Sequence, residues 1–123
     1  MYHIEITPSG KALKVKTQSQ ELILDSEDKA ISPLEALLAG LGGCMGVYLR
    51  RFLKANNLQT DFSITVDAEL SPAKPSSFPV INVAIDLKGF PLDDHKKSQL
   101  LEAVQKCPAH RTLQHSPEII IKL

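Results

Sequence analysis

The sequence contains no tryptophan, few other aromatic residues and only two cysteines. Aromatic side chains make up 5% of its 123 residues, and 14 basic side chains balance 14 acidic ones. Proteins that hold a nucleic-acid backbone usually carry a broad basic field, so the zero formal charge predicts no nucleic-acid partner. The two thiols, Cys44 and Cys107, are therefore the best indication of chemistry.

The chain also lacks a long uninterrupted apolar run and a basic-then-apolar leader after Met1. A spanning helix needs about 20 consecutive apolar residues, and a secretory signal has a charged and then apolar start. We therefore expect a cytoplasmic protein with no membrane partner. In a reducing compartment both thiols should be free or form a redox pair. The length and the lack of internal repeats predict a single domain over residues 1–123.

Alternating apolar and polar residues predict several short strands, and two longer segments have helical signals. Ser32, Pro33 and Glu35 form a capping box at the start of the first helix. The second helix opens at Pro91 to Asp94 and ends near Lys106. The order of elements predicts an α+β fold. The predicted strands cover residues 2–7, 13–16, 22–24, 62–70, 81–88 and 119–121.

Cys44 lies in the first helix among four glycines, each costing roughly 0.8–1 kcal/mol of helix propensity relative to alanine. A helix tolerates this cost where a second helix, a sulfur or a small substrate must approach its backbone. We therefore expect a buried central helix with Cys44 facing inward. The glycines are Gly40, Gly42, Gly43 and Gly46, and the predicted apolar stripe is Leu37, Leu41, Cys44, Tyr48 and Phe52.

Cys107 comes directly after the second predicted helix. Pro108 cannot continue that helix but can open a short new one over residues 109–113, with Cys107 as its N-cap. A thiolate at that position would interact with helix amides, which predicts a lowered pKa for Cys107. The alternative is that Cys107 is a small apolar residue at a corner.

The segments Ser32–Cys44 and Cys107–Leu113 resemble the cysteine motifs of the OsmC/Ohr family of thiol-dependent peroxidases, and the resemblance covers almost the whole chain. It implies antiparallel sheets around two central helices and an intertwined homodimer with active sites at the subunit interface. Cys44 would attack an organic hydroperoxide, Cys107 would resolve the sulfenic acid to a disulfide, and an external dithiol would reduce it. No cofactor or metal is implied. Apolar side chains near Cys44 favour an alkyl or lipid-like hydroperoxide.

The resemblance also implies an arginine from the N-terminal strands and a glutamate directly after the helix-opening proline. Neither matches, because no arginine precedes Arg50 and Leu34 follows Pro33. The candidate thiolate-stabilising cations are Arg111, which is the first choice, and Arg51. Lys14 and Lys16 are further candidates, and for each of these cations the alternative is a solvated surface charge.

Two other functions compete with a peroxidase. A small-ligand-binding or redox-sensing module would keep the fold and the thiols without efficient turnover, and the missing arginine and glutamate favour it. A metal site formed by Cys44, Cys107 and His110 is a weaker alternative, because no fourth ligand has a clear spacing. A single histidine such as His110 is more often a polar residue on a helix surface.

Overall fold

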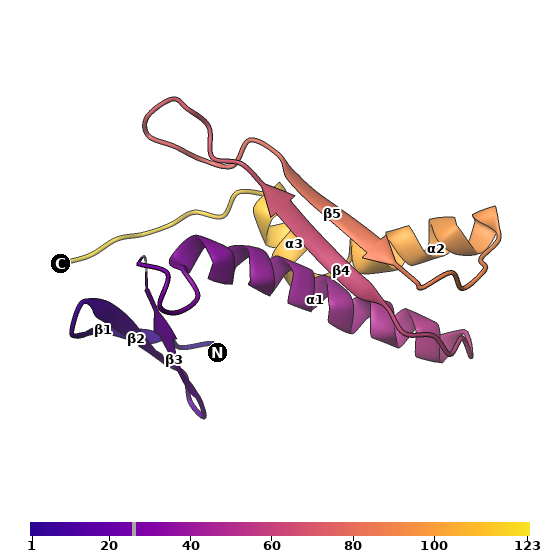
Figure 1. The fold of residues 1–123 in the computed structure, drawn as a ribbon, viewed down its shortest axis with the longest axis horizontal. Helices are drawn as coiled ribbons and strands as arrows, with labels where there is room; N and C mark the ends of the chain where they lie inside the picture. The colour runs from indigo at the N-terminus through magenta and orange to yellow at the C-terminus, as the bar shows by residue number, and fades with distance from the viewer. Residues whose placement is uncertain (26) are drawn as a thin grey trace. The chain divides into compact units, whose positions relative to one another are not determined.

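A computed structural model describes residues 1–25 and 27–123, and it has an α+β fold with antiparallel sheets and three helices (Figure 1). The chain divides into two compact units, Met1–Ala39 and Gly40–Leu123. The predicted fold class is therefore confirmed, whereas the single domain over the whole chain and the homodimer stay predictions.

The first unit contains an antiparallel meander of β1 (Glu5–Ser9), β2 (Ala12–Lys16) and β3 (Glu21–Leu24), in that spatial order (Figure 1). The predicted meander is confirmed, but its first strand was placed too early, at residues 2–7. The strand continues to Ser9 because the chain reverses at Gly10, whose φ of +62° lies in the left-handed region that glycine adopts without a steric cost.

Helix α1 (Pro33–Ala55) begins with the predicted capping box. The Glu35 amide donates to Ser32 Oγ at 3.1 Å, and the Ser32 amide donates to Glu35 Oε1 at 2.9 Å. The hydrogen bond from the Ser32 backbone lowers the pKa of the Glu35 carboxyl, because it stabilises the ionised form. Local side-chain chemistry therefore fixes where the helix starts.

Strands β4 (Ser63–Ala68) and β5 (Ile81–Asp86) pair antiparallel in the second unit, with Ser63 opposite Asp86. They confirm the two predicted strands with shorter ends. Side chains along β5 alternate between half-buried and exposed, as expected for a sheet with one covered face. That face packs against α1 (Figure 1).

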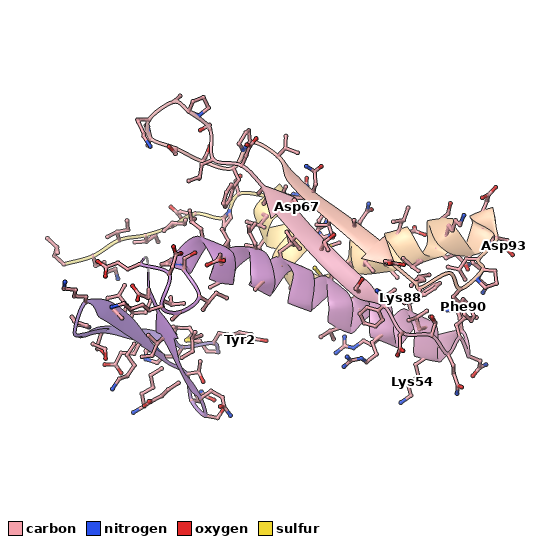
Figure 2. The ribbon with its side chains drawn as sticks, viewed as in Figure 1. Tyr2, Lys54, Asp67, Lys88, Phe90 and Asp93 are labelled. Carbon is pink, nitrogen blue, oxygen red and sulfur yellow. The ribbon has the colours of Figure 1, made fainter. Side chains whose placement is uncertain are left out.

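Two shorter helices follow, α2 (Asp94–Val104) and α3 (Pro108–Gln114). The Asp93 side chain caps α2 by accepting a hydrogen bond of 2.8 Å from the Lys96 amide, and Figure 2 marks Asp93 at the start of the helix. Helix α2 ends two residues before the predicted end at Lys106. The intervening turn places Cys107 at the start of α3.

The core of the second unit lies between α1, α2 and the β4–β5 pair. The predicted stripe on α1 is displaced, because Leu37 is 45% exposed while Met45 and Leu49 are buried. Cys44, Tyr48 and Phe52 are half-buried at the margin of the stripe and pack against the core. The fully buried cluster consists of Leu41, Met45, Leu49, Leu53, Leu100, Val104 and Cys107.

The prediction of a final strand over residues 119–121 is wrong. Within the described chain this segment has no strand partner, and Ile119, Ile120 and Ile121 are 79%, 70% and 88% exposed. A strand requires a neighbour for its backbone hydrogen bonds, which the apolar sequence alone cannot supply.

Helix α1 is long and apolar enough to cross a membrane by length and composition. A single helix of this kind is weak evidence for a membrane span, because the core helix of a soluble protein passes the same test. The expectation of no membrane partner remains a prediction.

Candidate thiol site

Cys44 lies in the middle of α1, close to a tight contact with β4. A Cβ atom added at Gly42 would lie 2.8 Å from Val66 Cγ2, and one at Gly46 would lie 3.5 Å from Ile64 Cδ1. The first distance is too short for a carbon–carbon contact, so α1 can approach β4 this closely only with glycine at position 42. The predicted need for close approach is thus explained for Gly42, whereas a Cβ at Gly46 would make an ordinary contact.

The other two glycines of α1 have a different environment. Added Cβ atoms at Gly40 and Gly43 would meet nothing within 4 Å in the described chain. Val47, one turn after Gly43, is 45% exposed. This part of α1 is therefore a small-residue and apolar surface facing away from β4.

Cys107 is the N-cap of α3, as predicted from Pro108. Its backbone is extended, with φ of −63° and ψ of 139°, and its Sγ accepts a hydrogen bond of 3.3 Å from the His110 amide. The residue is 0% exposed and belongs to the buried core cluster. The same sulfur is therefore both a capping acceptor and a core atom.

The two thiols are neighbours, and both are free. Burial raises the pKa of the Cys107 thiol, and a hydrogen bond and charge repulsion with Cys44 raise it further. Amide hydrogen bonds from His110 and Ala109 act in the opposite direction. The predicted lowering of the Cys107 pKa is therefore wrong, because desolvation outweighs the helix amides.

His110 makes two contacts at this end of α3. Its amide contacts Cys107 Sγ, and its ring Nδ1 lies 2.9 Å from the carbonyl oxygen of Gln105, the C-cap of α2. A carbonyl only accepts hydrogen bonds, so Nδ1 carries a proton in this contact. Sequence reasoning treated His110 as a surface residue, although its position three residues after the N-cap indicates the amide contact.

The predicted cations lie on different helices. The Arg51 guanidinium carbon is 5.0 Å from the centroid of the Tyr48 ring, a cation–π distance. Arg111 is exposed on α3, and its amide donates to the Cys107 carbonyl at 3.1 Å. In residues 1–25 and 27–123, none of the groups that shift the Cys107 pKa is a lysine or arginine side chain.

Among the described residues no group of three histidine, cysteine or acidic side chains is arranged to hold a metal ion. A groove of about 420 Å³, with mostly apolar residue types in its lining, lies beside the thiol-bearing helices, between α1, β5, α2 and α3. Its walls include Leu41, Met45, Val83 and Val104, and its polar members are Gln105, His110 and Gln114.

Comparisons with solved structures show the same fold. An OsmC-like protein from Mycoplasma pneumoniae matches with a TM-score of 0.79 and 21% identity over 94% of this chain and 89% of that one. The organic hydroperoxide resistance protein OhrB of Bacillus subtilis matches with a TM-score of 0.68 and 16% identity over 94% and 92%. An organic hydroperoxide resistance protein, OsmC, from Legionella pneumophila matches with a TM-score of 0.69 and 18% identity over 94% and 90%.

No curated protein sequence matches the chain significantly. The OsmC family model, described as OsmC-like protein, matches residues 26–122, and thus both cysteine segments. The chain belongs to the OsmC-like protein family.

Proposed function

We propose that the protein is a thiol-dependent peroxidase that reduces organic hydroperoxides. The observation that carries this proposal is the pairing of two free, interacting thiols, one half-buried on α1 and one wholly buried at the start of α3. Family membership suggests a role in peroxide resistance or redox chemistry. In this proposal Cys44 is the peroxidatic thiol and Cys107 is the resolving thiol.

The proposed reaction has two steps. The Cys44 thiolate attacks the outer oxygen of the hydroperoxide, the O–O bond breaks, and the alkoxide takes a proton and leaves as an alcohol. Cys107 then attacks the sulfur of the Cys44 sulfenic acid, forming the S–S bond as the S–O bond breaks and water leaves. An external dithiol returns both cysteines to thiols by exchange.

The groove beside the thiol-bearing helices supports an organic substrate, although neither Cys44 nor Cys107 lines it. Its walls come from aliphatic side chains of α1, β5 and α2, and hydrocarbon surface is buried favourably against such walls. Hydrogen peroxide has no apolar part that could use this surface. An alkyl or lipid-like hydroperoxide is therefore the proposed substrate class.

In the proposed mechanism a nearby cation favours the Cys44 thiolate, which is the form that attacks a peroxide. Arg111 and Arg51 remain the proposed groups. Arg111 is supported by its place on α3 directly after the Cys107 cap, and Arg51 by its position two turns after Cys44 on the same helix.

A homodimer completes the proposal. The open surface at Gly40, Gly43 and Val47 offers a second copy close contact with α1. Sedimentation velocity tests this directly. We expect a dimer for the parent and a monomer for Val47→Glu, with Lys54→Glu at the exposed end of α1 as a dimeric control; a monomeric parent would exclude the homodimer.

The enzymatic test treats the reduced protein with one equivalent of cumene hydroperoxide and follows free thiols and intact mass. We expect rapid loss of both thiols with a decrease of about 2 Da, since two hydrogens leave on disulfide formation. Cys44→Ser should abolish the reaction, and Cys107→Ser should stop at a sulfenic or higher oxide.

A redox-sensing module is the second candidate. The raised pKa of the Cys107 thiol favours it, because a protonated resolving thiol attacks a sulfenic acid slowly. Disulfide formation without repeated turnover in the presence of excess dithiothreitol would support the sensor. Thiols that persist at millimolar peroxide would exclude the peroxidase.

A further inference from the structure

His110 connects two helix ends around the buried sulfur. Its imidazole is anchored to the Gln105 carbonyl at the end of α2, and its amide points at Cys107 Sγ at the start of α3. Among the described residues, no other residue makes both of these contacts. The same residue thus links the position of α3 to the hydrogen bonding of a thiol.

We propose that His110 is a positioning residue for Cys107, and that its Nδ1–H anchor on Gln105 holds the first-turn amide of α3 against the sulfur. This inference rests on the proposed function only where it assigns Cys107 the resolving step. The contact itself concerns the thiol in any redox role.

The anchor matters because the sulfur is otherwise in an unfavourable place for charge. Cys107 is 0% exposed, so water cannot solvate a thiolate there. Amide hydrogen bonds are the compensating interactions, and their strength depends on distance and angle. An unanchored first turn of a seven-residue helix would fray and weaken them.

In the resolving step, the His110 amide acts on a single atom, Cys107 Sγ. Cys107 loses its proton as its sulfur forms the S–S bond, and the hydroxide leaving Cys44 takes up a proton to become water. The His110 amide stabilises the negative charge that develops on Cys107 Sγ before that bond is complete. Other titratable groups also lie near Cys107 and His110. Cys44 faces the thiol from α1. A second groove, on the surface of α2 and α3, also includes His110, and its charged or titratable members are Glu102, Lys106, Arg111 and His115.

The test measures the thiol pKa of Cys107 in a Cys44→Ala background, using thiolate absorbance at 240 nm with the double cysteine-free variant subtracted. We expect His110→Ala to raise the titration midpoint by about half a unit, a threefold loss of thiolate. His110→Asn keeps an N–H donor near the position of Nδ1 and should stay close to the parent. His115→Ala, which removes a histidine from the other end of α3, should not shift the midpoint.

An unchanged midpoint in His110→Ala, with native circular dichroism, would overturn the proposal. A shift in His110→Asn equal to that in His110→Ala would also overturn it, since the anchor would then be irrelevant. With Cys44 restored, His110→Ala should slow disulfide formation from the sulfenic acid about threefold. If peroxide oxidises neither thiol in the parent, the proposed peroxidase fails, whereas the titration still decides the role of His110.

Discussion

The two thiol-bearing segments are supported in different ways. Cys44 lies on a long helix whose position is set by packing, since Gly42 allows α1 to approach Val66 closely. Cys107 lies at a helix end set by hydrogen bonds, with its sulfur accepting from the His110 amide. Cys44 is half-buried and caps no helix in the described chain, whereas Cys107 caps α3 and lies wholly inside the core.

The two thiols therefore differ in their exposure and in the groups that can stabilise a thiolate. A half-buried thiol can meet a substrate, and a neighbouring cation would favour its reactive thiolate. A buried thiol has amide partners but excludes bulky reagents. In the proposed peroxidase, the first sulfur would meet the oxidant and the second would meet only the first sulfur.

The largest expected loss of stability comes from a substitution that disrupts the packing of α1 against β4, close to Cys44. Gly42→Ala should lower the free energy of unfolding by about 1–3 kcal/mol, because its Cβ would overlap Val66. Gly46→Ala is the matched control and should be neutral or stabilising by up to about 1 kcal/mol, since its Cβ would lie 3.5 Å from Ile64 Cδ1, an ordinary contact distance. Urea unfolding measures both. Equal stabilities would show that α1 and β4 are not closely packed.

The next effect compares the two sulfurs directly. Cys107→Ala should cost about 1–2 kcal/mol of unfolding free energy, because it removes both a buried sulfur and the N-cap of α3. Cys44→Ala should cost less than about 1 kcal/mol, since that sulfur is only half-buried. A larger loss for Cys44→Ala in chemical denaturation would reverse the comparison.

The pH dependence of stability provides a third test. The folded chain holds the Cys107 proton to higher pH than the unfolded chain, so stability is complete below the usual thiol pKa and falls as pH rises through the folded value. Above about pH 8.5 stability should fall with pH, with a slope no steeper than about 1.4 kcal/mol per pH unit, the limit for one proton. The Cys107→Ala variant should show a flatter profile, and parallel profiles would mean that the thiol pKa is not raised.

The smallest expected effect is a change in the Cys107 pKa, which measures the interaction between the two thiols. Cys44 raises the pKa of Cys107, so Cys44→Ala should lower it. The ¹³Cβ chemical shift of Cys107, followed by NMR across a pH series, measures the midpoint without a reagent that must reach the buried sulfur. His115→Ala serves as a control on α3, and an unchanged or higher midpoint in Cys44→Ala would show that the two sulfurs do not interact.

Local signals were enough to predict several of these features. Ser32 and Glu35 specify the start of α1, and Pro108 specifies α3 with Cys107 as its N-cap. Both depend on contacts within three residues. The family was also evident from the two cysteine segments, which the comparisons confirm.

The predictions that were wrong concern features that depend on distant parts of the chain. The Cys107 pKa is governed by burial among α1 and α2 side chains, which no local pattern reports. The segment 119–121 has strand-forming residues, but pairing requires a neighbour that the described chain does not provide. Likewise, the need for glycine at position 42 depends on Val66, which lies 24 positions further along the chain.

The capping role of Cys107 makes the first turn of α3 a readout of sulfur chemistry. A thiol or thiolate accepts the His110 amide hydrogen, and a disulfide or an alkylated sulfur accepts it less well. Oxidation therefore loosens that turn, and hydrogen exchange at the His110 amide should speed up while exchange within α1 stays slow. The backbone of one short helix would then report the redox state of a sulfur that solvent cannot reach.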